Sequence, residues 1–291
     1  MSLLTLLPLL SALTYALGSF AYKKAGTENV GSTRLYFIQS QVSLPLFLFL
    51  SIGHWDLQEA ADLIVPIYVG LTFFCGWLFT LFAIKSGDVS LQTPLMGMKV
   101  AFVALLAAAL GLSRPDTNLW GAVILASVAV FILGFPRRRK EGKTARTVGF
   151  VTISCLFFAA SDVLIGAAAA DFGLFPFLAV VVVTNAVLSF GLFPFFQGSL
   201  TSINPAGWKW SLIGAGLMTL QILTLTSYMG ITGEAAIANV LFSTRGLFAV
   251  ALGSVAARFL ALPSERLVPF VYCQRMIGAL LMVAAVTLVF V

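Results

Sequence analysis

The chain has 291 residues, of which 60% are hydrophobic and only 10% are charged, with a formal net charge of +6 and a mean hydropathy of +1.02. A water-soluble domain does not carry so much apolar sequence, so the composition excludes soluble proteins and predicts a polytopic membrane protein. Because lipid offers no partner to backbone polar groups, the spanning segments must be helices; barrel strands would be shorter and strictly alternating.

Apolar runs long enough to cross the hydrocarbon layer follow one another along the whole chain, with short turns between them. In chain order, the ten predicted spans are 3–22, 34–53, 63–84, 90–112, 117–135, 147–169, 172–196, 208–230, 235–260 and 267–291. These spans leave no room for an extramembrane domain. The predicted fold is therefore an all-α membrane protein with ten transmembrane helices.

The cations are concentrated in the loops on one side of the predicted membrane rather than spread evenly along the chain. Nearly all of them fall in the odd-numbered loops, whereas Arg114 alone lies clearly in an even-numbered one. The sequence thus predicts a multi-pass protein of the cell (inner) membrane. The positive-inside rule places its odd-numbered loops, including the basic linker 136–146, in the cytoplasm and both termini on the outer side. The net positive charge is thus explained by topology, so we expect a lipid bilayer and no nucleic acid as a partner.

One stretch of the chain occurs twice. Residues 87–106 align without a gap with residues 233–252, so that Asp88 matches Glu234 and Lys99 matches Arg245, at an offset of 146. The same offset relates other polar positions in the second and seventh spans. Each copy places a cation near the middle of an apolar span.

Five spans precede the basic linker and five follow it, which predicts three parts: a first repeat over 1–135, the linker 136–146 and a second repeat over 147–291. Because five is odd, the second repeat enters the membrane from the opposite side. The sequence therefore predicts two inverted five-helix repeats around a central cavity.

The repeat also resembles a known family. Its fourth helix opens with Gly-Asp or Gly-Glu and continues with an apolar Pro-Leu-x-Gly stretch, and its last helix carries Trp-Gly-Ala or Ile-Gly-Ala. This pattern resembles the EamA-type repeat of the drug/metabolite transporter superfamily. The resemblance implies a cavity between the first four helices of each half, peripheral fifth and tenth helices, and alternating access without ATP.

Three ionisable side chains are expected inside the membrane, where they are costly unless they face a cavity or a partner. They are Lys99, Arg245 and Asp162, of which Asp162 has no carboxylate counterpart in the other repeat. In one interpretation, Lys99 and Arg245 hold a carboxylate, phosphate or sulfate group. The resemblance to the superfamily implies the same, because its triose-phosphate and nucleotide-sugar translocators also use cations on these helices to bind anionic groups. In the other, Asp162 neutralises Arg245, or Arg245 caps carbonyl groups, while Lys99 snorkels or is deprotonated. A proton-coupling role for Asp162 is the third alternative.

Uncharged polar side chains are further candidates for substrate binding. On the second and seventh spans they form two pairs at i, i+4 spacing, Gln39 with Ser43 and Asn185 with Ser189, so each pair shares a helix face. They could bind substrate hydroxyl or amide groups, or they could only join helices. Two tyrosines beside the presumed cavity, Tyr15 and Tyr228, could line it or pack within the core.

The sequence contains no nucleotide-binding, metalloprotease or paired-carboxylate motif, so we expect no catalytic residue, no metal and no cofactor. The leading hypothesis is a secondary transporter that moves a small organic anion, a carboxylate or phosphorylated metabolite, by exchange or with protons. An exporter of amino acids or amphipathic compounds is the alternative, and a lipid scramblase is the alternative from another class. Small residues near Gly121 and Gly278 would permit a homodimer.

Overall fold

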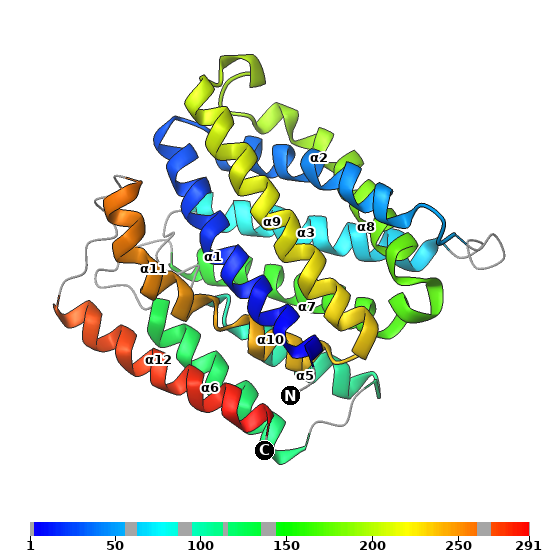
Figure 1. The fold of residues 1–291 in the computed structure, drawn as a ribbon, viewed down its shortest axis with the longest axis vertical. Coiled ribbons are helices and arrows are strands. Elements are labelled where there is room, and N and C mark those ends of the chain that lie inside the picture. The colour runs from blue at the N-terminus through cyan, green and yellow to red at the C-terminus, as the bar shows by residue number, and fades with distance from the viewer. Residues whose placement is uncertain are drawn as a thin grey trace.

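The computed structural model describes residues 3–55, 63–86, 95–112, 116–134, 144–260 and 269–290. Within these ranges the chain consists of helices and the turns that join them, with no strand (Figure 1). The first half contains, in order, a short 3₁₀ helix η1 (Leu3–Thr5), α1 (Leu6–Thr27), α2 (Ser32–Ser51), α3 (Ile64–Ser86), α5 (Met98–Ala109) and α6 (Thr117–Gly134). These helices fall within the first five predicted spans or overlap them closely.

The second half contains α7 (Thr144–Phe172), α8 (Leu174–Ser189), the 3₁₀ helices η3 (Phe190–Phe195) and η4 (Leu200–Ser202), α9 (Pro205–Thr232), α10 (Ala235–Phe242), α11 (Arg245–Phe259) and α12 (Pro269–Val289). Local sequence sets the ends of α9: the Asn204 side chain caps its start, and Gly233 ends it with a φ of 73°. Most of the predicted linker, 136–143, and the repeated motif's opening, 87–94, lie outside the described residues.

The ninth predicted span, 235–260, contains a candidate membrane span over 235–253, but its helix is interrupted. A turn at Ser243 and Thr244 separates α10 from α11. Both hydroxyls bond back to carbonyl groups of the preceding turn, Ser243 Oγ to Asn239 and Thr244 Oγ1 to Leu241, and such bonds compete with the regular helical pattern. A hydropathy pattern does not detect this competition, because the flanking residues remain apolar.

A matching turn precedes α5. Residues 96 and 97 form a turn directly before Met98, and at the repeat offset of 146 Gly97 corresponds to Ser243. Lys99 and Arg245 therefore each lie in the first turn of a helix that follows an interruption. The interruptions and the two cations share the register of the sequence repeat.

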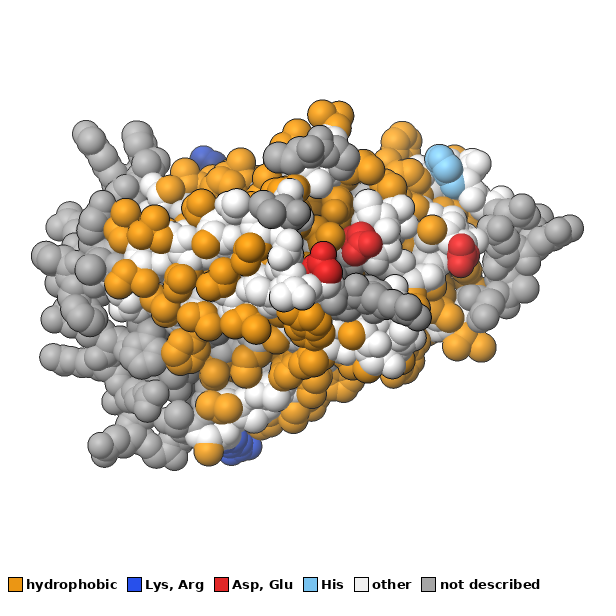
Figure 2. Space-filling model, turned by 90° about the horizontal axis from the view of Figure 1, so that it is seen from below, with side chains coloured by type: hydrophobic (Ala, Val, Ile, Leu, Met, Phe, Trp, Pro, Cys, Tyr) orange, Lys and Arg blue, Asp and Glu red, His pale blue; other side chains and the backbone are white. Residues whose placement is uncertain are grey.

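The helices have the length and surface of a membrane protein. Six of them within the described residues are long and apolar enough to cross a bilayer, and shorter apolar helices lie at 98–109, 117–132 and 276–289. Large apolar side chains are exposed on many elements, including Phe49, Ile64, Val187 and Leu280. Figure 2 shows a face of the molecule on which hydrophobic side chains predominate and charged ones are few. The chain is thus a multi-pass membrane protein.

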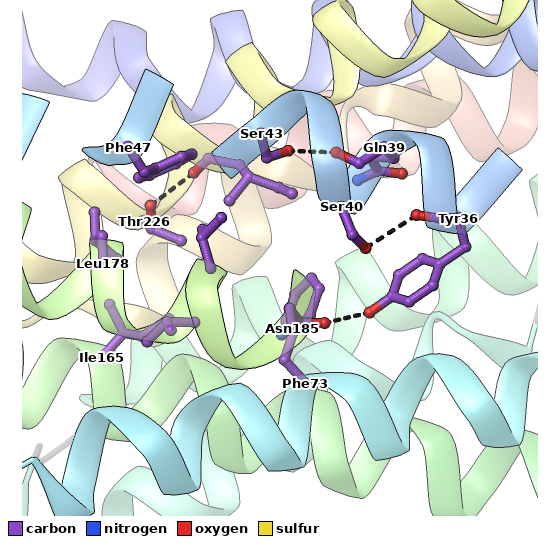
Figure 3. Close-up of a pocket in the computed structure, with 13 residues that line it drawn as sticks. Tyr36, Gln39, Ser40, Ser43, Phe47, Phe73, Ile165, Leu178, Asn185 and Thr226 are labelled. Atoms are coloured by element: carbon purple, nitrogen blue, oxygen red, sulfur yellow. Dashed lines mark hydrogen bonds between the residues drawn. The ribbon is translucent and has the colours of Figure 1, made fainter. Parts of the chain in front are cut away.

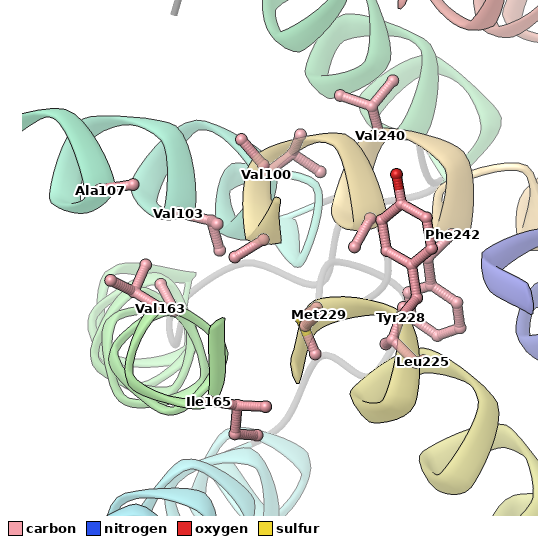
Figure 4. Packing of buried hydrophobic residues seen from close by; sticks show 14 of the residues in the cluster. Val100, Val103, Ala107, Val163, Ile165, Leu225, Tyr228, Met229, Val240 and Phe242 are labelled. Carbon is pink, nitrogen blue, oxygen red and sulfur yellow. The ribbon is translucent and has the colours of Figure 1, made fainter. Parts of the chain in front are cut away.

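The two halves pack against each other along their length. Helix α1 lies along α9 and α3 lies along α7, while α2 packs against α8 and α6 packs against α12 (Figure 1). The largest core cluster joins both halves, with Val100 and Val103 of α5 facing Val163 of α7 and Val240 of α10 (Figure 4). This packing brings the fourth and ninth predicted spans close to α7.

Candidate functional site

A pocket lies between α2 and α3 of the first half and α7, α8 and α9 of the second (Figure 3). Its cavity volume is about 40 Å³, and the space not filled by atoms reaches about 480 Å³ only when the open side is included. Apolar side chains make up most of its wall: Phe47, Phe73, Ile165, Leu178, Val181, Val182 and Ile222. The polar lining residues are Tyr36, Gln39, Ser40, Ser43, Asn185 and Thr226, and none of the lining residues is charged.

The polar groups of the pocket are largely held by the protein itself. The Tyr36 hydroxyl donates to Asn185 Oδ1 (Figure 3). Asn185 Nδ2 donates to the Gly70 carbonyl at 3.0 Å, so Asn185 joins α8 to both α2 and α3. The hydroxyls of Ser40 and Thr226 donate to carbonyls one turn back in their own helices. Their oxygens keep lone pairs with which they can accept a hydrogen bond from a ligand.

Gln39 is the lining residue with a donor to spare. Its Oε1 accepts a hydrogen bond of 3.1 Å from the Tyr22 hydroxyl, which orients the amide. No bond from its Nε2 to any described residue is present, although the residue lines the pocket. The pocket therefore offers one amide donor and several hydroxyl acceptors within an apolar wall, a composition typical of sites for small, mostly apolar molecules.

A separate charged cluster lies where α5, α7 and α10 meet. Lys99 Nζ is 2.6 Å from Asp162 Oδ2, and Asn239 Nδ2 donates to the same oxygen at 2.7 Å. The Lys99 and Asp162 side chains are only 11% and 6% exposed. Asp162 and the pocket residue Ile165 are three positions apart on α7, so they share a helix face about one turn apart.

Arg245 lies in a different environment. Its guanidinium carbon is 5.0 Å from the ring centre of Tyr15 and 4.4 Å from that of Phe242, so it rests against two aromatic faces. No carboxylate of the described residues pairs with it. Asp162 thus forms an ion pair with Lys99 and not with Arg245.

The structure divides the residues singled out in the sequence between three places. Gln39, Ser43 and Asn185 line the pocket, Lys99 and Asp162 form the charged cluster, and Arg245 lies against Tyr15. Ser189 accepts a hydrogen bond from Gln41 Nε2 at 3.1 Å and joins α8 to α2 outside the pocket lining. Tyr228 is buried in the apolar core and is also not a lining residue (Figure 4).

Sequence reasoning missed two residues that organise these regions. Asn239 donates the second hydrogen bond to Asp162 Oδ2. Tyr36 bonds to Asn185 across the pocket and stacks on Trp77 with ring centres 3.8 Å apart. Asn239 is a buried amide among the apolar residues of α10, which could have indicated a polar partner. Tyr36 lies one turn from Gln39 and Ser40 on a predicted helix, but nothing in the sequence indicates its contact with α8.

Helices that cross the membrane around a small, mostly apolar pocket are typical of a transport protein. Residues 2–135 match the model of the EamA-like transporter family. These residues, which span the predicted first repeat, are thus similar to that family of the drug/metabolite transporter superfamily. The match indicates a membrane transporter of the drug/metabolite type.

A solved structure shares the fold of almost the whole chain. A protein described only as "Crystal structure of protein" superposes with a TM-score of 0.81 at 13% sequence identity, covering 99% of this chain and 96% of that chain. At this identity the likeness shows a shared fold. No curated protein sequence matches the chain.

Proposed function

We propose that this chain is a secondary transporter that moves a mostly apolar molecule with uncharged polar groups, by alternating access of its two halves. The lining of the pocket carries this proposal. An apolar wall with one free amide donor and no charged residue suits an amphipathic compound better than a small hydrophilic anion. The ion pair between Lys99 and Asp162 supports the same choice, because it neutralises one of the two cations expected to bind an anion.

The packing of the helices supports an inverted repeat. If α1, α2, α3, α5 and α6 correspond to α7, α8, α9, the α10–α11 pair and α12, then the contact of α1 with α9 becomes that of α7 with α3. The contact of α1 with α11 likewise becomes that of α7 with α5. The pairs α2–α8 and α6–α12 are each mapped onto themselves, because the two helices of each pair correspond to each other. A pseudo-two-fold axis in the membrane plane would produce this pattern.

Alternating access requires contacts between the halves that can open at one end. The start of α2 meets the segment between α8 and α9, where Arg34 Nη1 donates to the Ser199 carbonyl at 3.0 Å. Nearby, Asn204 Nδ2 donates to Glu28 at 3.1 Å. We infer that these bonds hold one end of the bundle closed. Lys23, Lys24 and Arg34 are close to them in the chain, so we infer that this end faces the cytoplasm and that both termini lie outside.

A second candidate function is transport of a small organic anion. The observation that favours it is the surplus charge of Arg245, which has no acidic partner among the described residues and only two aromatic rings against it. An anionic group near α11 would satisfy that charge. In this case the polar residues of the pocket would bind the rest of the molecule.

Ligand-induced thermal stabilisation of the purified protein separates the two candidates. N-acetylphenylalaninamide serves as a neutral amphipathic probe, and benzoate and glycerol 3-phosphate serve as anionic probes. We expect stabilisation by the neutral probe, its loss in Val181→Phe, which fills the pocket, and its retention in Arg245→Gln. Stabilisation by the anions alone, abolished by Arg245→Gln and unaffected by Val181→Phe, would overturn the amphipathic assignment and favour the second candidate.

A further inference from the structure

The side-chain amide of Gln39 is held in one orientation by a tyrosine that does not line the pocket. The Tyr22 hydroxyl of α1 donates to Gln39 Oε1 at 3.1 Å and makes no other hydrogen bond with the described residues. If the amide turned over, Gln39 Nε2 could donate to the Tyr22 oxygen, but the Tyr22 proton would then have no acceptor among these residues. A donor left without a partner away from water costs free energy, so this bond decides which end of the amide is free.

The Tyr22 ring is itself fixed by packing against α9. A Cβ atom on Gly214 would lie 2.3 Å from Cδ1 and 2.5 Å from Cε1 of Tyr22, so the ring occupies the space that a side chain on α9 would fill. The same ring packs against a core cluster that includes Ile38 of α2 and Ala215 of α9. The position of the Tyr22 hydroxyl is therefore set by the packing of three helices.

The free end of the Gln39 amide is accessible to a ligand. Gln39 is half-buried and lines the pocket, and its Nε2 makes no hydrogen bond with any described residue. In the described part of the chain, the fully enclosed side-chain atoms without a partner are Arg34 Nε and Ser211 Oγ. Gln39 Nε2 is thus not enclosed by protein, and its N–H groups remain available as donors.

The other polar groups of the lining already donate within the protein (Figure 3). Asn185, the repeat equivalent of Gln39, uses its Nδ2 for the Gly70 carbonyl. The lining hydroxyls also donate their protons to protein groups, and they belong to Tyr36, Ser40, Ser43 and Thr226. Of the two side-chain nitrogens among the lining residues, Gln39 Nε2 is therefore the one without a partner.

We propose that Tyr22 is a positioning residue, which keeps the N–H groups of Gln39 free for the ligand and thereby makes the pocket select neutral compounds that carry a carbonyl group. This proposal rests on the proposed function, because it takes the pocket as the substrate site. A carbonyl oxygen accepts from Gln39 Nε2, whereas a compound that can only donate gains no bond with Gln39. The apolar wall, which includes Phe47 and Phe73, holds the apolar part of the same compound.

Two neutral aromatic probes of opposite hydrogen-bonding character test this role. Benzylacetone has a carbonyl acceptor and no donor, whereas indole has an N–H donor and no carbonyl or hydroxyl group. The affinity of each probe is measured by titration of the purified full-length protein, in the parent and in Tyr22→Phe, which keeps the ring and removes the hydroxyl. Tyr68→Phe, which removes the hydroxyl of an exposed tyrosine on α3, is the matched control.

The ratio of the two affinities separates positioning from a general loss of structure, which would weaken both probes. In Tyr22→Phe the amide can turn over and offer Oε1 to the ligand, so benzylacetone should bind more weakly and indole at least as tightly as in the parent. The ratio should fall by roughly five-fold, which corresponds to one neutral hydrogen bond. Gln39→Leu should lower it similarly, and adding Tyr22→Phe to Gln39→Leu should change it no further, because Tyr22 acts through Gln39. Tyr68→Phe should keep the parent's ratio.

An unchanged ratio in Tyr22→Phe would overturn the proposal, as would a further fall when Tyr22→Phe is added to Gln39→Leu, or a parent that binds indole but not benzylacetone. Gly214→Ala displaces the Tyr22 ring without removing the hydroxyl, so it should lower the ratio as well, and it decides the outcome should Tyr22→Phe fail to fold. Failure of both probes to bind the parent would overturn the proposed function together with this proposal. Binding of benzylacetone to the parent, with the same ratio in the Tyr22 and Gly214 variants, would overturn this proposal alone.

Discussion

The surroundings of Lys99 and of Arg245 are the most informative comparison within this molecule. The two cations are equivalent in the sequence repeat, each follows an interrupted helix, and each is met by the first helix of the opposite half. However, α7 presents the carboxylate of Asp162 to Lys99, whereas α1 presents the ring of Tyr15 to Arg245. The backbone and the position of the cation thus follow the repeat, while the opposing side chain decides whether the charge is neutralised.

The largest effect on stability should come from removing Lys99, the cation that Asp162 neutralises. Lys99→Met leaves the Asp162 carboxylate buried without a cation, and removing one partner of a buried ion pair costs about 3–5 kcal/mol. We expect a correspondingly large loss of thermal stability in detergent. The double variant Lys99→Met, Asp162→Leu should recover much of it, because no unpaired charge then remains. A double variant as unstable as the single one would show that the pair stabilises the fold by more than its mutual neutralisation.

A second pair of repeat-equivalent residues tests the packing of the halves. A Cβ atom on Gly70 would lie 2.6 Å from Thr184 Cβ and 2.9 Å from the Val181 carbonyl oxygen, whereas one on Gly216 would meet nothing within 4 Å. Gly70→Ala should destabilise the protein by about 1–3 kcal/mol, as overpacking does. Gly216→Ala is the matched control and should be neutral or slightly stabilising in the same unfolding measurement. Equal effects would show that α3 and α8 do not approach this closely.

The stability of the protein should be less sensitive to substitution of Arg245 than to substitution of Lys99. Contacts of a cation with aromatic rings contribute about 0.5–2 kcal/mol, so Arg245→Gln should lower stability by less than Lys99→Met does. Arg245→Lys keeps the charge and should lie between Arg245→Gln and the parent protein. If Arg245→Gln were as disruptive as Lys99→Met, Arg245 would need an ionic partner beyond the two rings. Thermal unfolding of the three variants under one set of conditions checks the order.

The sequence repeat predicted the helical membrane fold and the equivalence of Lys99 and Arg245, because hydropathy and residue spacing alone determine both. It did not predict the turn before Arg245, since the side-chain hydroxyls of Ser243 and Thr244 donate to backbone carbonyls in a segment whose flanking residues are apolar. Nor could it decide which cation Asp162 would meet. That choice depends on how α7 packs against α5, which is a contact between halves that a single helix does not specify.

The smallest expected change in stability is that of Gln39→Leu in the pocket, and a second glutamine of α2 provides its matched control. Gln39 lines the pocket and accepts a bond from Tyr22, whereas Gln41 faces α8 and donates to the Ala186 carbonyl and the Ser189 hydroxyl. Each change to Leu removes hydrogen bonds that contribute about 1 kcal/mol apiece, so both variants should remain folded. Only Gln39→Leu should weaken binding of N-acetylphenylalaninamide, since it alone removes the free donor in the pocket. Titration of both variants with the probe checks this, and equal affinities would place the ligand's carbonyl groups elsewhere.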